Sequence, residues 1–242
     1  MKTFLLKSIW LASFPFMPLV LPQALYVKRS TLRLPEAMGP RTFNDPQSAP
    51  LSLLHVGEST VAGVGVNEIK QGFTHHLAQS LAYHKNIDVN DVAYHVCGEN
   101  GIRLDALNDH ISDLPNGFDV ALVTMGVNDC SKFTSLKKWH NNIHTCIKAL
   151  KQKTHGPIFF TQVPPMADFP ALPFPIKNIL GLRATLLDKE LQKICLNYDQ
   201  VYHLNIDVPL EDNMMARDGY HPSAKGYETW AQLIAPSILE KL

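Results

Sequence analysis

The sequence predicts an α/β fold in which a mostly parallel, five-stranded sheet lies between two layers of helices. Short apolar runs, which are typical of buried strands, alternate with longer amphipathic stretches of helical spacing. Glycines and polar residues follow most of these runs, as expected for loops at one edge of a parallel sheet. Alternating strands and helices require crossover connections, so the predicted architecture is a three-layer α/β/α sandwich.

The strand candidates share a length of six residues and a mainly apolar composition. They are residues 51–56, 92–97, 120–125, 158–163 and 201–206. Each of the first four is followed by apolar residues that recur at intervals of three and four, as on one face of a helix. Between the third and fourth strands this set is Trp139, Ile143, Cys146, Ile147 and Leu150. The last strand leads through a loop to a predicted helix over residues 223–239.

Residues 1–30 form a hydrophobic N-terminal segment with the layout of a signal peptide or a single membrane anchor. Its uncharged stretch, residues 8–27, follows Lys7 and precedes Lys28. The stretch is just long enough to span a bilayer, but three prolines disfavour a regular spanning helix. These are Pro15, Pro18 and Pro22.

No small-x-small cleavage site precedes Lys28, so we expect the N-terminal segment to be retained and to associate with a membrane or the cell envelope through residues 8–27. Basic residues flank both ends, and the positive-inside rule therefore does not orient the segment. A cytoplasmic position of the domain stays open as well.

The rest of the chain is predicted to be a linker over residues 31–50 and one catalytic domain over residues 51–242. Lys plus Arg and Asp plus Glu number 22 each, so no basic field attracts nucleic acid, and we expect no nucleic-acid partner. The four cysteines are widely spaced and form no Cys-x-x-Cys pair, which argues against a zinc ribbon or a redox motif.

Polar residues that suit acyl transfer cluster where the predicted strands end. Ser59 follows the first strand, Gly101 the second and Asn128 the third, while Asp218 and His221 follow the fifth. The carboxyl ends of parallel strands meet at one edge of a sheet, so we expect these residues to lie close together.

Serine-based acyl transfer needs a nucleophile, a base, a group that orients the base, and donors for the oxyanion. We expect Ser59 to be the nucleophile, at a junction of strand and helix, with His221 as base and Asp218 as its orienting carboxylate. The amides of Ser59 and Gly101 and the side chain of Asn128 are the predicted oxyanion donors.

In order, Ser59, Gly101, Asn128 and His221 resemble the four block residues of the SGNH (GDSL-type) hydrolase family. The sequences around Asn128 and His221 look like the third and fifth blocks of that family, and the resemblance covers residues 51–239. It implies a flavodoxin-like SGNH hydrolase fold and an esterase or lipase-like activity without a cofactor. The chain departs from the family at Glu58, where an aspartate is usual, and this puts the hydrogen bonds of that carboxylate in question.

Single residues of this set also have interpretations other than catalysis. Ser59 and Asn128 could be helix caps, and Asp218 could belong to an ordinary turn. His140 and His144 share a helical face, but they lack the glutamate of a zinc protease, so no metal site is predicted. No nucleotide motif accompanies the glycines near Ser59.

Residues 163–182 are apolar and rich in proline, which predicts an irregular wall beside the active site. The expected substrate is therefore a small-molecule or lipid-like carboxylic ester, with lipid-like or short acyl esters favoured. A carbohydrate O-acetylesterase, a thioesterase and a noncatalytic envelope-associated binding protein remain the alternatives.

Overall fold

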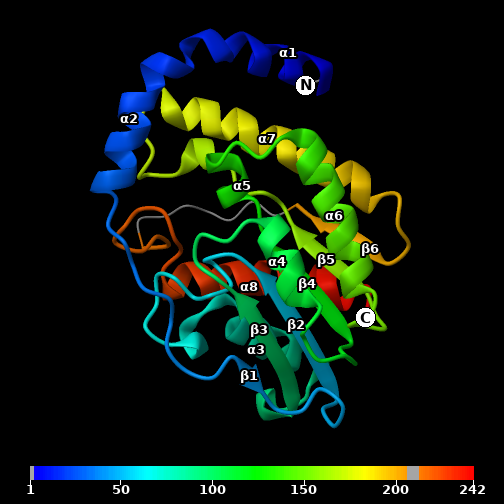
Figure 1. Cartoon of the computed structure of the whole chain (residues 1–242). Coiled ribbons are helices and arrows are strands. Elements are labelled where there is room, and N and C mark those ends of the chain that lie inside the picture. The colour runs from blue at the N-terminus through cyan, green and yellow to red at the C-terminus, as the bar shows by residue number, and fades with distance from the viewer. Residues whose placement is uncertain (1–2, 206–212) are drawn as a thin grey trace.

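A six-stranded sheet forms the centre of the computed structural model, which describes residues 3–205 and 213–242 (Figure 1). The strands have the order β1-β3-β2-β4-β5-β6, and all neighbours except β1 and β3 are parallel. Their bounds are β1 Thr42–Phe43, β2 Leu51–Gly57, β3 Val92–Gly98, β4 Val120–Thr124, β5 Ile158–Thr161 and β6 Val201–Leu204. The five predicted strands are all present, and the predicted end of the last one, residue 206, lies outside the described residues.

The sixth strand, β1, lies within the predicted linker and corrects the predicted strand count of five. It pairs antiparallel with β3, and the ring of Phe43 stacks on that of Tyr94 at 5.3 Å between centroids. A strand of two residues has no periodicity that a sequence pattern could reveal, since its position is determined by the neighbouring strand and this ring contact.

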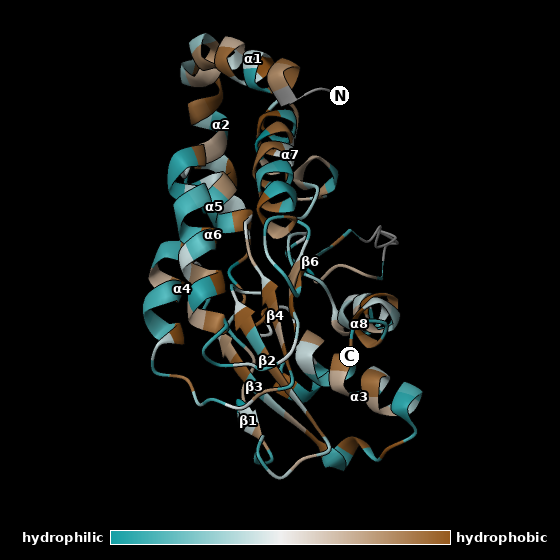
Figure 2. Cartoon of the chain, turned by 90° about the vertical axis from the view of Figure 1, so that its right-hand side faces the viewer, coloured by the Kyte–Doolittle hydropathy of each residue, from teal (hydrophilic) through white to brown (hydrophobic). Residues whose placement is uncertain are grey.

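Helices cover both faces of the sheet (Figure 2). One face packs against α4, α6 and α7, and the other against α3 and α8. The helical bounds are α3 Phe73–Lys85, α4 Leu104–Ile111, α5 Val127–Ser131, α6 Leu136–Leu150, α7 Ile176–Cys195 and α8 Ala224–Leu239, with short 3-10 turns η2 Ile69–Gln71, η3 Val89–Asp91 and η4 Met166–Asp168. The three-layer α/β/α prediction is confirmed.

The central strands β2 and β4 are buried along their whole length. One ionisable side chain on β2, His55, hydrogen-bonds to the hydroxyls of Thr74 (2.8 Å) and Thr124 (3.0 Å). Burial lowers the pKa of His55 to about 3, so this ring is neutral and serves the core, with both nitrogens satisfied.

The N-terminal segment forms a bent helical arm, consisting of α1 Thr3–Ser13, η1 Phe14–Phe16 and α2 Met17–Ser30. The stretch Phe4–Ser30 is long and apolar enough to cross a membrane by length and composition. Its helices turn sharply at η1, and α1 lies along α7 (Figure 1).

Candidate active site

Ser59 lies in a loop directly after β2, at the carboxyl edge of the sheet. The expected junction of strand and helix is wrong here, because residues 58–66 form turns and α3 begins only at Phe73. Gly57 permits the loop and the neighbouring strand to approach closely, since a Cβ at this position would lie 2.2 Å from the carbonyl oxygen of Thr124 and 2.5 Å from Val61 Cγ2. The Ser59 carbonyl then accepts a hydrogen bond from the amide of Val64 at 2.9 Å, which closes the loop.

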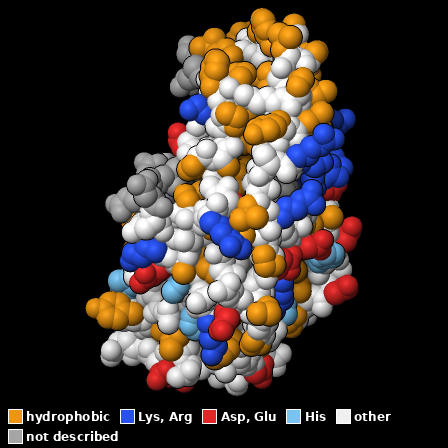
Figure 3. All heavy atoms as spheres, turned by 90° about the vertical axis from the view of Figure 1, so that its left-hand side faces the viewer, with side chains coloured by type: hydrophobic (Ala, Val, Ile, Leu, Met, Phe, Trp, Pro, Cys, Tyr) orange, Lys and Arg blue, Asp and Glu red, His pale blue; other side chains and the backbone are white. Residues whose placement is uncertain are grey.

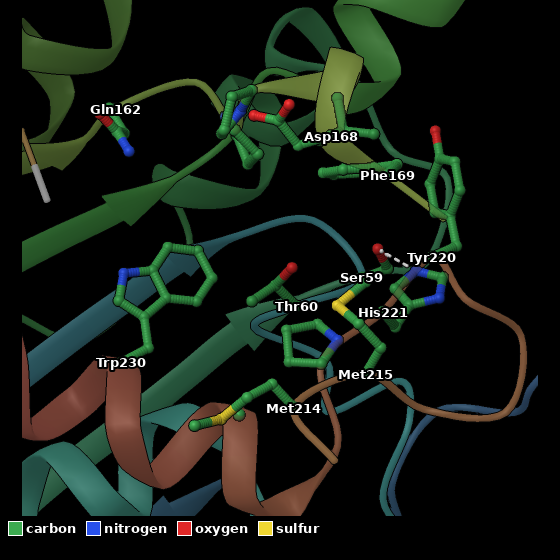
Figure 4. Close-up of a pocket in the computed structure, with 15 residues that line it drawn as sticks. Ser59, Thr60, Gln162, Asp168, Phe169, Met214, Met215, Tyr220, His221 and Trp230 are labelled. Atoms are coloured by element: carbon green, nitrogen blue, oxygen red, sulfur yellow. Dashed lines mark hydrogen bonds between the residues drawn. The ribbon is translucent and has the colours of Figure 1, made fainter. Parts of the chain in front are cut away.

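A continuous chain of hydrogen bonds joins Ser59, His221 and Asp218, three residues that the sequence predicted to meet. Figure 4 shows the bond between Ser59 and His221. The distance from His221 Nδ1 to Asp218 Oδ2 is 2.7 Å, and that from His221 Nε2 to Ser59 Oγ is 2.8 Å. An ionised carboxylate can only accept, so Nδ1 carries the ring proton and leaves Nε2 to accept from the serine hydroxyl.

The Asp218 carboxylate is held from two directions. Its Oδ1 accepts hydrogen bonds from the backbone amides of Tyr220 and His221, each at 3.0 Å, while Oδ2 receives the imidazole. Burial acts to raise the pKa of Asp218, but the hydrogen bonds from the His221 ring and the two amides outweigh it and leave the pKa below its ordinary value. Asp218 therefore remains charged opposite the imidazole.

Glu58, which stands where the family usually has aspartate, is buried and fully engaged. Its Oε1 accepts from the Val127 amide at 2.9 Å, and Oε2 accepts from the Asn128 amide at 2.9 Å and from Asn128 Nδ2 at 2.6 Å. Burial raises its pKa to about 7, even though these three hydrogen bonds favour the charged form. Glu58 thus connects the loop of Ser59 to the first turn of α5.

Asn128 and Gly101, the other predicted oxyanion donors, have different surroundings. Asn128 lies within α5, and the N-cap of that helix is Gly126. The side chain of Asn128 is held by its hydrogen bond to Glu58, the residue that precedes Ser59. Gly101 adopts φ +83°, with open space at its Cβ position, and its carbonyl accepts from Lys132 Nζ at 2.5 Å. In the part of the chain that the structure describes, neither Gly101 nor Asn128 is among the residues that line the pocket.

A pocket opens beside Ser59 and His221 (Figure 4). Its walls come from five parts of the chain: the Ser59 loop, the start of α5, the segment after β5, the loop that carries His221, and α8. The apolar members of the lining are Val127, Pro164, Pro165, Phe169, Met214, Met215, Pro222 and Trp230. Polar groups are fewer, and a largely apolar cleft with a few polar groups is the usual form of a small-molecule site.

The prediction of an apolar wall over residues 163–182 holds for its first part. Pro164, Pro165 and Phe169 line the pocket, whereas the regular helix α7 begins at Ile176 and contradicts an irregular course beyond that point. Sequence reasoning missed Trp230, which α8 brings to the pocket from nine residues after His221. Trp230 looks like any core-facing helical residue, so no signal distinguishes it.

The His140 and His144 pair forms a local network on the surface of α6. His144 Nε2 lies 3.1 Å from His140 Nε2, and His140 Nδ1 lies 2.8 Å from Glu190 Oε1. In the part of the chain that the structure describes, no group of three or more His, Cys, Asp or Glu side chains is arranged to hold a metal ion.

Fold and site together define a class: a three-layer α/β/α protein with a Ser–His–Asp arrangement at the carboxyl edge of its sheet. The model of the GDSL-like lipase/acylhydrolase family matches residues 55–229. The chain belongs to this family, which supports an ester hydrolase. A comparison with curated protein sequences finds no significant match.

Solved structures with the same fold are similar over most of this chain. A lipolytic G-D-S-L family protein from Veillonella parvula DSM 2008 has 13% identity and a TM-score of 0.60, and covers 79% of this chain and 100% of its own. The family 3 carbohydrate esterase of Clostridium thermocellum has 17% identity and a TM-score of 0.60, with 78% and 97% covered. The lipase/acylhydrolase from Enterococcus faecalis has 19% identity and a TM-score of 0.59, with 79% and 97% covered.

Proposed function

We propose that this protein is a serine esterase that hydrolyses carboxylic esters through an acyl-enzyme on Ser59. The observation that carries the proposal is the chain of hydrogen bonds from Asp218 through His221 to Ser59. Ser59 Oγ attacks the ester carbonyl while His221 Nε2 takes the hydroxyl proton and passes it to the departing alcohol. Water then attacks the acyl-serine with His221 again as base, which releases the acid and restores Ser59.

The proposed oxyanion site consists of the amides of Ser59 and Gly101 and the side chain of Asn128. The Asn128 amide group has two N–H donors, and the bond to Glu58 occupies one of them, so the other is left for a developing oxyanion. Glu58 acts here as a positioning residue, because it fixes the orientation of the Asn128 side chain without touching the substrate.

The pocket favours lipid-like or short acyl esters as substrates. Phe169, Met214 and Trp230 offer an acyl chain an apolar surface, and each buried methylene contributes about 0.8 kcal/mol to binding. Gln162 and Asp168 bring polar groups to the same pocket, which is the observation that favours the second candidate, a carbohydrate O-acetylesterase. Two acetyl-xylan or carbohydrate esterases have this fold.

A thioesterase would use the same groups, whereas a noncatalytic envelope-associated binding protein would have no need of the Asp218–His221–Ser59 chain. The apolar N-terminal segment supports a location at a membrane or the cell envelope.

Labelling with a fluorophosphonate probe tests the nucleophile, because such probes react with activated serines. We expect the full chain to be labelled, and Ser59→Ala to lose both labelling and ester hydrolysis, by on the order of 10⁴-fold or more. Ser135→Ala is the matched control, since Ser135 is an exposed cap of α6 and its loss should lower only the thermal stability. Undiminished labelling or hydrolysis in Ser59→Ala would overturn the mechanism.

A panel of p-nitrophenyl esters from acetate to palmitate, together with acetylated xylan, tests the substrate class. We expect kcat/KM to be highest on an ester with an apolar acyl chain. Higher activity on acetylated xylan than on every p-nitrophenyl ester would favour the carbohydrate O-acetylesterase instead.

A further inference from the structure

The outer surface of the N-terminal arm, residues 3–30, is unusually apolar (Figure 3). Of the eighteen large apolar side chains that are exposed among the described residues, ten belong to this arm. They are Phe4, Leu5, Ile9, Leu11, Phe14, Phe16, Leu19, Leu21, Leu25 and Tyr26. A continuous apolar surface of this kind marks an interaction site on a folded protein.

The inner side of the arm is already committed to the domain. Leu6 and Trp10 are buried against Leu186 of α7. The ring of Trp10 also lies 5.2 Å from the Arg183 guanidinium and stacks on Phe133 at 6.0 Å between centroids. These contacts hold α1 along α7. One face of α1 therefore packs on the domain, and its opposite face is exposed.

The charge of the arm identifies the partner as an anionic lipid surface. The arm contains three basic residues and no acidic one, and two further basic residues flank it. The basic residues are Lys2, Lys7, Lys28, Arg29 and Arg33. An apolar helical face bordered by basic residues is the pattern of helices that lie in the membrane interface, where each basic residue near an anionic surface contributes about 1 kcal/mol.

The geometry of the arm favours an in-plane position over a spanning one. Crossing a bilayer takes roughly 20 apolar residues in one helix, whereas α1 has 11 residues, α2 has 14, and the chain bends between them at Phe14–Phe16. Straightening the arm to span the membrane would also remove Leu6 and Trp10 from α7. The apolar surface of α7 that Leu6 and Trp10 now cover would then be exposed to water.

Gln23 of the arm is hydrogen-bonded to the end of the proline-rich segment that begins at the pocket. Gln23 Nε2 donates to the Phe174 carbonyl at 2.7 Å, and Gln23 Oε1 accepts from the Ile176 amide at 3.2 Å. Phe174 and Ile176 lie at the end of the segment between β5 and α7, and the beginning of that segment, at Pro164, lines the pocket. Figure 1 places the arm beyond the same edge of the sheet from which the Ser59 loop departs.

We propose that the arm lies in the plane of an anionic membrane surface, with its outer apolar side chains in the headgroup region, and that it holds the Ser59 pocket beside that surface. Lipid binding by the arm stands independently of the chemistry at Ser59. The delivery of an ester from the membrane to the pocket rests on the proposed function.

Flotation of the full chain with lipid vesicles tests the binding, and the Ser59→Ala protein is used so that hydrolysis does not alter the vesicles. We expect binding to vesicles of phosphatidylcholine with phosphatidylglycerol, and weaker binding to phosphatidylcholine alone or at high salt. Leu11→Glu with Leu19→Glu should weaken binding by about tenfold or more, because both side chains are exposed on the outer face. Tyr83→Glu with Leu196→Glu is the matched control, since these apolar residues lie outside the arm and are at least as exposed.

Failure of the wild-type arm to bind anionic vesicles, or an equal loss in the control variant, would overturn the proposal. The in-plane position is tested by a protease applied outside sealed vesicles that carry the protein with a tag added before Met1. We expect the tag and the domain to be cleaved alike. Protection of the tag would show a spanning arm and would also overturn the proposal.

Hydrolysis separates this proposal from the proposed function. With active protein, the double substitution at Leu11 and Leu19 should lower the hydrolysis of a lipid ester presented in anionic vesicles by about tenfold and leave dissolved p-nitrophenyl acetate unaffected. Equal rates on the vesicle ester would overturn the role of the arm in holding the pocket at the surface. A wild-type chain that binds vesicles but hydrolyses neither ester would refute the esterase and leave the lipid-binding surface established.

Discussion

Two buried carboxylates near Ser59 receive matching sets of donors: Glu58, which precedes Ser59 in the chain, and Asp218, which is joined to Ser59 through His221. Each accepts two backbone amides and one side-chain N–H, with all distances between 2.6 and 3.0 Å. Their pKa values nevertheless shift in opposite directions, upward to about 7 for Glu58 and below the ordinary value for Asp218. The number of hydrogen bonds alone therefore does not decide the charge of a buried carboxylate.

What differs is the depth of burial and the nature of the third donor. Glu58 is the more deeply buried, its side-chain donor is the neutral amide of Asn128, and the nearby Asp129 carboxylate adds repulsion. Asp218 faces the His221 imidazole, which in the proposed mechanism becomes a cation when it takes the serine proton. In the proposed mechanism a charged Asp218 stabilises that cation, whereas Glu58 holds the neutral Asn128 donor in place, so the two carboxylates would serve the base and the oxyanion site respectively.

Among substitutions at these two carboxylates and their partners, the largest effect is expected from removing the charge of Asp218, which faces the proposed base. Asp218→Asn should lower kcat by on the order of 10²- to 10⁴-fold, because the imidazole loses its orienting anion. Asp188→Asn is the matched control: Asp188 Oδ1 lies 2.8 Å from His203 Nε2 in a similarly buried pair, yet in the described chain no hydroxyl or thiol side chain is hydrogen-bonded to His203.

The control should lose thermal stability while kcat stays within a few-fold of wild type. Steady-state kinetics and thermal unfolding of both variants provide the measurement. An equal fall of kcat in the two would mean that any buried histidine–carboxylate pair supports the reaction, and the role assigned to Asp218 would be lost.

A smaller effect is expected at Asn128, on the side of Glu58. Asn128→Ala should lower kcat by about 10²- to 10³-fold with little change in KM, since its donor acts on the developing oxyanion. Asn128→Asp should be worse than Ala, because it places a carboxylate against both the oxyanion and Glu58. An Asp variant that is stable and active would remove Asn128 from the oxyanion site.

The sequence predicts the strands and the Ser59–His221–Asp218 chain because these depend on local patterns: apolar runs, and polar residues at the ends of strands. It does not predict β1, because the position of that strand depends on its pairing with β3 and on the ring of Tyr94. It also does not predict the three hydrogen bonds of Glu58, because their donors lie in α5, about seventy residues further along the chain. The apolar pattern of residues 8–27 is visible in the sequence. The bend at Phe14–Phe16 is suggested only by prolines, and the packing of Trp10 on α7 is a tertiary contact without a local signal.

The smallest effect is expected in the pH dependence of the free energy of unfolding. The folded pKa of Glu58, about 7, exceeds its ordinary value of 4.5, so the unfolded chain loses this proton first as pH rises. The stabilising contribution of the protonated group is then fully present below pH 4.5 and is lost as pH rises through 7, by up to roughly 3 kcal/mol. Asp218, whose folded pKa is lowered, contributes with the opposite sign, and its stabilisation is lost as pH falls.

Denaturant unfolding from acid to neutral pH separates the two carboxylates. Glu58→Gln should be less stable at every pH, because one amide donor loses its acceptor at a cost of about 1–3 kcal/mol, but the decline of stability between pH 4.5 and 7 should be smaller than in wild type. Asp218→Asn should instead reduce the decline toward acid pH. The slope with pH is the decisive quantity, since both substitutions also change packing. If the slope of unfolding free energy against pH is the same in Glu58→Gln as in wild type, Glu58 has the same pKa in the folded protein and in the unfolded chain. The two carboxylates would then differ only in their neighbours, Asn128 and His221.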